Sequence, residues 1–351
     1  MSNKLLLGLT LVFGFLVLES HGSSLRQHDL HGRFRHKSAT DTGIVVCSIC
    51  PDARAIQPCT CVCHNATSAD IKCGSELTSC EQLTDILNVA TPVSQYLRLV
   101  VEKTSLQCML TNDIWGPVTF QEVILRENKF SALDNHAFAN FNKSMKILNL
   151  QKNQLSSICF ATFNNQPYLE ILNLDDNKIM FIAGYGNMAV KTLKEIHLQH
   201  NLITSVQQYT FQLMPLLQKI DYSHNKISEI DPGAFSFEKR TTENRLLINL
   251  SNNSLENFSH AAISGIENVT LNLSYNKIQD LSEFQELLRN TNFKARIFLT
   301  GNPITCDPSL CWIIQNKTIT KCFDNFECIN NSIKLYNLTA DDLGCDGLKA
   351  Q

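Results

Sequence analysis

The sequence predicts an α/β solenoid, a horseshoe in which short parallel strands stack coil upon coil into one concave β-sheet, with a disulfide-bonded cap at each end. Three observations predict this fold. A short apolar motif ending in Asn recurs with a period near 24 residues; the chain of 351 residues contains 33 Asn, as many as Asp and Glu together; and its 14 cysteines gather towards the two ends.

The recurring motif ends at eight Asn residues, each followed two places later by an apolar residue. Apolar residues at alternate positions before each Asn predict a short strand whose inward side chains fill a core. We expect each Asn amide to satisfy backbone groups at the turn that leaves the strand. A ninth motif has Thr104 in place of Asn, and the other eight end at Asn128, Asn153, Asn177, Asn201, Asn225, Asn253, Asn276 and Asn302.

This motif resembles the LxxLxLxxNxL pattern of the leucine-rich repeat family, whose period is 20 to 29 residues. The resemblance implies eight or nine repeats within residues 96–301. Because the terminal repeats of a solenoid would expose its core, caps are expected at both ends. The cysteine-rich segments 47–95 and 302–351 lie where these caps belong.

The first residues predict export. Lys4, the apolar run 5–18 and the small residues around His21 are typical of a signal peptide spanning 1–22. Its 14 apolar residues are too few for a membrane span, which needs roughly 20. Residues 23–46 are basic and rich in His, which predicts a flexible arm; contact with a polyanion or metal, or removal as a propeptide, are the alternatives. We therefore expect a secreted, extracellular protein without a membrane span.

Composition excludes two broad classes of protein. Hydrophobic residues make up 44% of the chain, charged residues 18%, and the net charge is -3. A disordered acidic tail would be more charged and less apolar, and a nucleic-acid-binding protein would be basic. The partner is therefore not expected to be a nucleic acid.

The first cysteine cluster resembles the amino-terminal cap of extracellular leucine-rich repeat proteins. That resemblance implies pairing of Cys50 with Cys61 and of Cys59 with Cys73. Cys80 and Cys108 are candidates for a bridge between adjacent coils, and Cys47 with Cys63 would complete the set. A zinc site is the less favoured alternative in an exported chain.

The second cluster resembles the carboxy-terminal cap, although Cys306 and Cys311 are five residues apart where the family commonly has a separation of one. The pairing there stays open, with disulfides expected among Cys306, Cys311, Cys328 and Cys345. Because this cap holds five cysteines, at least one thiol must be free or bonded to another chain. Cys159, alone in the middle of the chain, is expected to be a small buried side chain.

Ten Asn-x-Ser/Thr sequons accompany the export signal. Glycans on the concave-face sequons Asn249, Asn252 and Asn272 would shield the carboxy-terminal half of the sheet. We expect glycans at the other seven, which are Asn65, Asn142, Asn257, Asn268, Asn316, Asn330 and Asn337.

No motif of a known catalytic or nucleotide-binding type is present, and an open concave sheet suits partners better than a closed reaction pocket. Two outward rows of side chains are predicted on this sheet, and they end with Tyr275–Gly301 and Asn272–Phe298. His and carboxylate residues gather at their middle, where partner contact, a metal site, a pH-dependent surface and a solvated face that pairs its own charges are the alternatives. The predicted contact residues are Asp175, Asp176, His197, Gln199, His200, Asp221 and His224.

A closer resemblance rests on Cys50-Pro-Asp-Ala, Pro58-Cys-Thr-Cys, Cys73-Gly and the segment from Trp115 to Val123. These stretches resemble arthropod secreted proteins related to the non-catalytic subunit of Oplophorus luciferase. The resemblance implies that a separate small chain performs the oxidation and that the repeat chain supports it. We therefore expect a non-enzymatic protein without a cofactor, whose partner is another secreted chain such as a smaller catalytic subunit. The alternatives are a soluble recognition module of the innate-immune or guidance type, and an enzyme that uses the His and Asp cluster.

Overall fold

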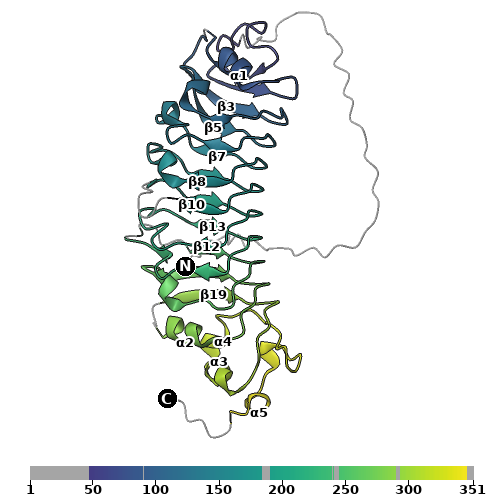
Figure 1. Cartoon of the computed structure of the whole chain (residues 1–351). Coiled ribbons are helices and arrows are strands. Elements are labelled where there is room, and N and C mark those ends of the chain that lie inside the picture. Colours follow the sequence, from purple (N-terminus) through teal and green to yellow (C-terminus); the bar gives the residue numbers. More distant parts are fainter. Residues whose placement is uncertain are drawn as a thin grey trace, which may run out of the picture. The chain divides into compact units, whose positions relative to one another are not determined.

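The computed structural model describes residues 47–89, 91–183, 190–238, 240, 245–289 and 293–345. The predicted signal peptide, 1–22, and the predicted arm, 23–46, lie outside the described residues. The described chain winds as a solenoid, and successive coils place one strand each beside the strand of the coil before (Figure 1).

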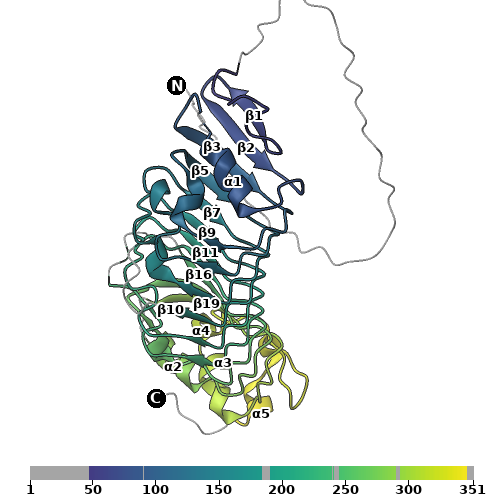
Figure 2. The same cartoon turned by 45° about the horizontal axis from the view of Figure 1, so that its top comes forward.

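Eleven strands form one sheet, and its order follows the chain except that short strands of other sheets intervene (Figure 2). β1 and β2 pair antiparallel, and every later pair is parallel. The predicted capped solenoid with a parallel sheet is confirmed. In sheet order the strands are β1 Thr60–Asn65, β2 Ser68–Cys73, β3 Gln95–Val101, β5 Thr119–Ile124, β7 Ile147–Asn149, β9 Ile171–Asn173, β11 Glu195–His197, β13 Lys219–Asp221, β16 Leu246–Asn249, β18 Asn268–Asn272 and β19 Lys294–Phe298.

The opposite side of the coils, the convex side, carries short strands and single helical turns. Its strands pair in twos and are β4 Met109–Leu110 with β6 Ala132–Leu133, β8 Ser157–Cys159 with β10 Phe181–Ala183, β12 Ser205–Val206 with β14 Glu229–Ile230, and β15 Phe235–Ser236 with β17 Ile263–Ser264. The α-helices are α1 Cys80–Leu87, α2 Ser282–Leu288, α3 Cys311–Ile314, α4 Lys317–Thr320 and α5 Ala340–Leu343. The 3-10 helices are Asn112–Trp115, Ala139–Phe141, Phe160–Phe163, His260–Ala262, Pro308–Leu310 and Leu335–Asn337.

The core between the two sides is apolar and continuous. The inward strand residues, such as Leu148 and Leu172, are completely buried. Aromatic rings fill the wider convex half, where Trp115, Phe138 and Phe163 stack in succession with ring centroids 5.7 and 6.3 Å apart. Each coil thus buries its apolar face only against its neighbours, as expected for a repeat protein.

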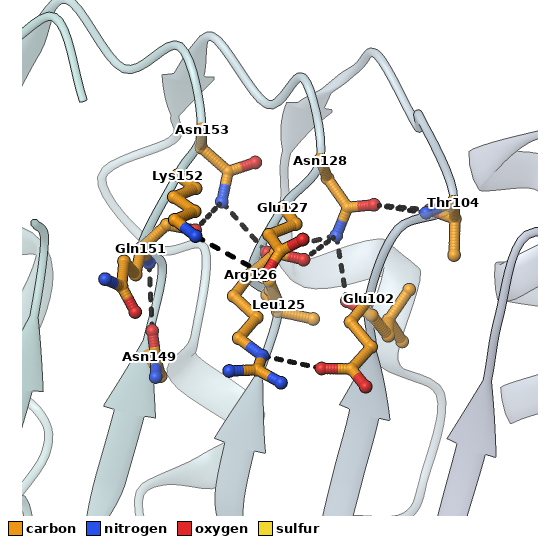
Figure 3. Close-up of polar contacts among 11 residues, drawn as sticks. Glu102, Thr104, Leu125, Arg126, Glu127, Asn128, Asn149, Gln151, Lys152 and Asn153 are labelled. Atoms are coloured by element: carbon orange, nitrogen blue, oxygen red, sulfur yellow. Dashed lines mark hydrogen bonds and ion pairs between the residues drawn. The ribbon is translucent and has the colours of Figure 1, made fainter. Parts of the chain in front are cut away.

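The repeated Asn residues form a ladder along one edge of this core. The Nδ2 group of Asn153 donates to the carbonyl oxygen of Leu125 in the preceding coil (Figure 3) and to that of Leu150 in its own, both at 2.9 Å. Its Oδ1 accepts the N–H of Phe130 from the preceding coil at 3.2 Å. Equivalent bonds recur at the other seven Asn residues, and Thr104 begins the ladder by donating to Asn128. The ladder satisfies backbone groups that the sheet cannot reach, as the sequence predicts.

The residue before each ladder position has a left-handed backbone. Glu127, Lys152 and Tyr275 have φ of 58°, 55° and 56°, and only in the last coil is the residue a glycine, Gly301, with φ of 78°. This conformation costs a side-chain-bearing residue about 1 kcal/mol. The buried Asn bonds hold the turn in place and offset that cost.

Four disulfides close the amino-terminal cap and two close the other. The structure pairs Cys47 with Cys63, Cys50 with Cys61, Cys59 with Cys73 and Cys80 with Cys108, so these thiols are not zinc ligands. In the second cap it pairs Cys306 with Cys328 and Cys311 with Cys345. Cys322 and Cys159 are free and partly exposed, so Cys159 is not the fully buried side chain that the sequence suggests.

The second cap joins the sheet through one carboxylate. Asp324 accepts the N–H groups of Leu299 at 2.8 Å and of Thr300 at 3.0 Å, and it also accepts the Thr300 hydroxyl. Its own N–H donates to Ile297 of β19 at 2.9 Å. The last coil is therefore capped by polar groups as well as by covalent bonds.

Candidate partner-binding face

The outward side of the eleven-stranded sheet, here called the concave face, carries the residues that alternate with the buried ones along each strand. It divides by chemistry into three parts. An amino-terminal part spans β2 to β9, a middle part spans the coils of β9 to β13, and a carboxy-terminal part spans β16 to β19.

The amino-terminal part combines aliphatic side chains with paired charges. Val100 lies in register with Ile124, and Ile147 with Ile171, and all four are half-buried. Beside them a hollow of about 340 Å³ is lined by Lys72, Arg98, Val100, Glu102, Ile124, Arg126 and Asn149. The Arg126 Nε donates to Glu102 at 2.6 Å (Figure 3), so the charge at the rim of the hollow is largely neutralised within the protein.

A buried carboxylate fixes the edge of this part to the cap. Asp70 on β2 is fully buried, and its Oδ2 lies 2.9 Å from His64 Nε2 and 3.2 Å from Arg98 Nη2. Burial alone would raise the pKa of Asp70, but hydrogen bonds and charge from His64 and Arg98 outweigh it, and the pKa lies below its ordinary value. Arg98 is therefore committed to the fold.

The middle part contains the predicted contact residues, and two of them are buried. Asp175 is 2% exposed, and its carboxylate accepts both the backbone N–H and the side-chain amide of Gln199 in the next coil, each at 2.8 Å. Burial raises the pKa of Asp175, and the charge of Asp221 adds to the rise, against the hydrogen bonds from Gln199 and the charge of His197. Asp221 is 6% exposed and accepts the Ser223 N–H at 3.1 Å and hydroxyl at 2.7 Å.

These carboxylates continue a local pattern. In most coils an Asn or Asp at one outward position accepts the N–H two residues later. Asn149 does so for Gln151 (Figure 3), and Asn249 does so for Ser251. His197 occupies that position in its coil, and its ring contacts Glu195 Oε2 at 3.0 Å instead. Asp175 supplies the missing acceptor from the coil before. Asp175 therefore stabilises the fold by joining two coils.

The remaining predicted residues lie at the edge of the face. His200 and His224 are exposed and stack with ring centroids 4.3 Å apart, and Asp176 accepts a 3.0 Å hydrogen bond from Gln151. All three occupy the left-handed turn position rather than a strand, which corrects their predicted place in a row on the sheet. The two-residue alternation stops where the Asn ladder bends the chain. In the described part of the chain, no group of three or more His, Cys, Asp or Glu residues is arranged to hold a metal ion.

The sequons differ in the freedom of their amides. Asn65, Asn142, Asn257, Asn316 and Asn337 are exposed, and Asn268 is half-buried. Asn330 is exposed, but its amide bonds to both the N–H and the carbonyl of Cys306. On the concave face, the Asn249 amide donates to Asp221 at 3.1 Å, and Asn272 lies in register with Phe298.

The carboxy-terminal part holds a feature that the predicted contact set omits. Phe298 and Tyr275 are 38% and 58% exposed, and Arg296 is exposed beside Phe298 on β19. Phe298 ends one of the predicted outward rows, whereas Tyr275, like His200 and His224, occupies the left-handed turn position at the edge of the face. The exposure of these two rings depends on the neighbouring coils, which the sequence of one coil does not reveal.

A family model described as "Leucine rich repeat" matches residues 119–179 and 191–243. These ranges cover the strands and the Asn ladder of the central coils. The chain has the fold of leucine-rich repeat proteins. Over the described residues, no helix is both long enough and apolar enough to cross a bilayer.

One curated relative extends the likeness beyond the repeats. The chain is 28% identical over 319 residues to the Oplophorus-luciferin 2-monooxygenase non-catalytic subunit of Oplophorus gracilirostris, covering 82% of this chain and 86% of the relative. The match is too long to come from the central coils alone and must reach into the caps.

Two solved structures share the fold of this chain. A chain from the octameric complex of Latrophilin 3, Unc5D and FLRT2 (LRR) has a TM-score of 0.56 at 17% identity, covering 81% of this chain and 92% of that one. A chain of the TLR13–ssRNA13 complex has a TM-score of 0.51 at 22% identity, and 65% of this chain matches 35% of that larger one. At these identities the likeness concerns the fold.

Proposed function

We propose that the chain is a secreted, non-enzymatic scaffold whose concave face binds a second secreted protein, as the accessory subunit of a complex with a smaller catalytic chain. The likeness to a non-catalytic subunit over 82% of the chain supports the subunit role. Six disulfides suit an oxidising, extracellular setting.

The observation that carries the proposal is the aliphatic surface on four consecutive strands of the concave face. Val100, Ile124, Ile147 and Ile171 all point outward from β3, β5, β7 and β9 and remain half-buried without a cover. A partner that covered them would gain about 25 cal/mol for each Å² of apolar surface removed from water. The paired charges around them would form the polar rim that is usual in interfaces.

The first test is isolation of the native protein from secretions without reductant, followed by mass measurement of the intact complex and identification of co-purifying chains. A smaller companion chain at a fixed ratio supports the proposal. A lone monomer or a self-dimer contradicts it and favours a soluble recognition module, which retention on microbial or cell surfaces would then reveal.

The second test locates the interface. The variant Ile124→Asp/Ile147→Asp should lose the companion chain while it keeps its fold by circular dichroism. A matched control, Met109→Asp/Phe181→Asp, places the same charges on two convex residues that are each 51% exposed, and it should keep the companion. Loss of the companion from the convex variant alone would move the interface to the other side. For the enzymatic alternative, catalytic activity that survives His200→Ala/His224→Ala would remove the support that the His and Asp cluster gives it.

A further inference from the structure

The last strand of the sheet presents two cations and an aromatic ring to solvent. Lys294, Arg296 and Phe298 of β19 are exposed and alternate with buried Ala295 and Ile297. Because residues two apart on a strand point to the same face about 6.6 Å apart, the three side chains form one line on the concave face. The line ends beside the carboxy-terminal cap.

A second exposed aromatic ring, from the coil before, lies at the turn that follows β19. Tyr275 is 58% exposed, and its ring lies over the backbone of Gly301, where an added Cβ would come within 2.5 Å of Tyr275 Cδ1. The glycine therefore provides the room in which the ring rests. Aromatic side chains with an adjacent Arg are the residue types that dominate the binding energy of protein interfaces.

The cations here lack the partners that cations have elsewhere on the sheet. Lys194 and Lys219 lie 2.6 and 3.8 Å from the carboxylates of Glu170 and Asp221. Among the described residues, Arg245, Lys294 and Arg296 form no such ion pair, and Arg245 instead donates to the Val269 carbonyl at 3.0 Å.

Local electrostatics agree with an excess of positive charge. Burial lowers the pKa of Arg245, and the nearby charge of Arg296 lowers it further. Asp324, which the cap places against the end of β19, already uses both carboxylate oxygens on the N–H groups of Leu299 and Thr300. An added carboxylate would therefore relieve repulsion between guanidinium groups.

We propose that the surface formed by Arg245, Lys294, Arg296, Phe298 and Tyr275, here called the β19 patch, binds an acidic segment of the partner protein that also carries an apolar side chain. The inference rests on the proposed scaffold function and adds the chemistry of the partner. Carboxylates at alternate positions of an extended segment match the spacing of Lys294 and Arg296, and the Arg guanidinium can hold a carboxylate by two hydrogen bonds.

The proposal sets a condition on one sequon. Asn272 of β18 lies directly beside Phe298 in the sheet, and its Oδ1 accepts the Ser274 N–H at 3.1 Å. A glycan on Asn272 would lie against Phe298 and block the approach of a segment along β19. The β19 patch therefore requires that Asn272 is unmodified in the secreted protein.

The test uses the full-length secreted protein and a fluorescein-labelled peptide of twelve residues that repeats Glu-Ser-Glu-Ser-Leu-Ser, followed by fluorescence anisotropy. In an extended peptide two Glu and one Leu of each repeat then lie on the same face, as the line of Lys294, Arg296 and Phe298 requires. Binding should be saturable and should weaken with added salt, because salt screens exposed charges. In Lys294→Ser/Arg296→Ser the affinity should fall about tenfold, which corresponds to roughly 1.4 kcal/mol. Phe298→Ala should weaken binding at every salt concentration and leave its salt dependence unchanged.

A matched control removes the same charge elsewhere on these coils. Lys226→Ser/Lys277→Ser changes two exposed cations beyond the turn, and it should bind the peptide as the unmodified protein does. Several results would overturn the proposal: no binding of the peptide, equal losses in both charge variants, binding of a heparin fragment but not of the peptide, or a glycan on Asn272 by mass spectrometry. If the protein does not bind the peptide but still co-purifies with a companion chain, the proposal for the β19 patch is wrong and the proposed scaffold function is unaffected.

Discussion

Asp175 bonds to Gln199 twice, once through the backbone N–H and once through the side-chain amide, both at 2.8 Å. The pair joins two coils. Asp175 accepts the Gln199 N–H that an Asn or Asp would accept in most coils, where this coil has His197. Asp175→Ala should lower the free energy of unfolding by about 1–3 kcal/mol, because the half-buried N–H and side-chain amide of Gln199 lose their acceptor. Urea denaturation measures the loss, and Asp176→Asn, a neighbouring charge removal that spares this bond, should stay within about 0.5 kcal/mol.

Because the pKa of Asp175 is raised in the folded state, its contribution to the free energy of unfolding depends on pH. The folded state holds a proton on this carboxyl at higher pH than the unfolded state does, so stability falls as pH rises from the ordinary pKa of the carboxyl to its raised folded value. Asp175→Asn cannot titrate and should lack this component of the slope. A series of urea denaturations across that interval tests the prediction, and equal slopes for the two proteins would contradict it.

Asp70 should act in the opposite direction. Its pKa is lowered in the folded state, so its contribution is complete above the ordinary pKa of an aspartate and is lost as pH falls towards the lower folded value. Asp70→Asn should destabilise the protein by about 1–3 kcal/mol at neutral pH, because Arg98 and His64 lose a charged acceptor. In acid the difference in free energy of unfolding between the variant and the unmodified protein should shrink. A difference that does not change with pH would contradict this prediction.

Gly301 should tolerate no side chain while Tyr275 rests upon it. Gly301→Ala adds left-handed strain of about 1 kcal/mol and a clash with the ring. Truncation of the ring in Tyr275→Ala/Gly301→Ala should remove the clash and leave the strain, so the two substitutions should be non-additive in a double-mutant cycle. Gly74→Ala, with nothing within 4 Å of the added Cβ, is the matched control and should be nearly neutral.

Thiol counting tests the cysteine framework. Twelve of the 14 cysteines are bonded, so the unfolded, unreduced protein should react with a thiol reagent at two positions, Cys159 and Cys322. Burial raises the pKa of Cys322, so its reaction in the folded protein should be slow at neutral pH. Cys322→Ser should leave one reactive thiol. A count below two in the native secreted protein would indicate a bond to another chain.

The sequence predicted the parts of the fold that repeat. Each Asn of the ladder, from Asn128 to Asn302, stands at a fixed distance from its strand, so one motif specifies both the turn and the inward residues. The motif does not specify contacts that depend on the residues of neighbouring coils. The burial of Asp175 follows from His197 in the next coil, and the role of Asp324 follows from Phe298, which also lacks a side-chain oxygen.

The positions of some candidate residues were predicted less well than the fold, because period-2 alternation was extended past the strand ends. His200 and His224 were placed on the sheet by that rule, whereas the ladder turns the chain left-handed at their positions. Phe298 and Tyr275 stood in the predicted rows, but exposure depends on whether a neighbouring coil or cap covers a side chain. Phe298 and Tyr275 stay exposed in the folded chain, beside the carboxy-terminal cap and the turn that follows β19.

The bond from Asp175 to Gln199 also limits how this chain can change in length. Most coils carry their own acceptor at the outward Asn or Asp position, so duplication or deletion of such a coil, other than the coil of Asn173 and Asp175, would leave every remaining coil with its acceptor. The coil of His197 borrows its acceptor and cannot be separated from the coil before it. The two coils should therefore be gained, lost or transplanted into another solenoid only together. Recombination between them would separate the Gln199 amide from its acceptor.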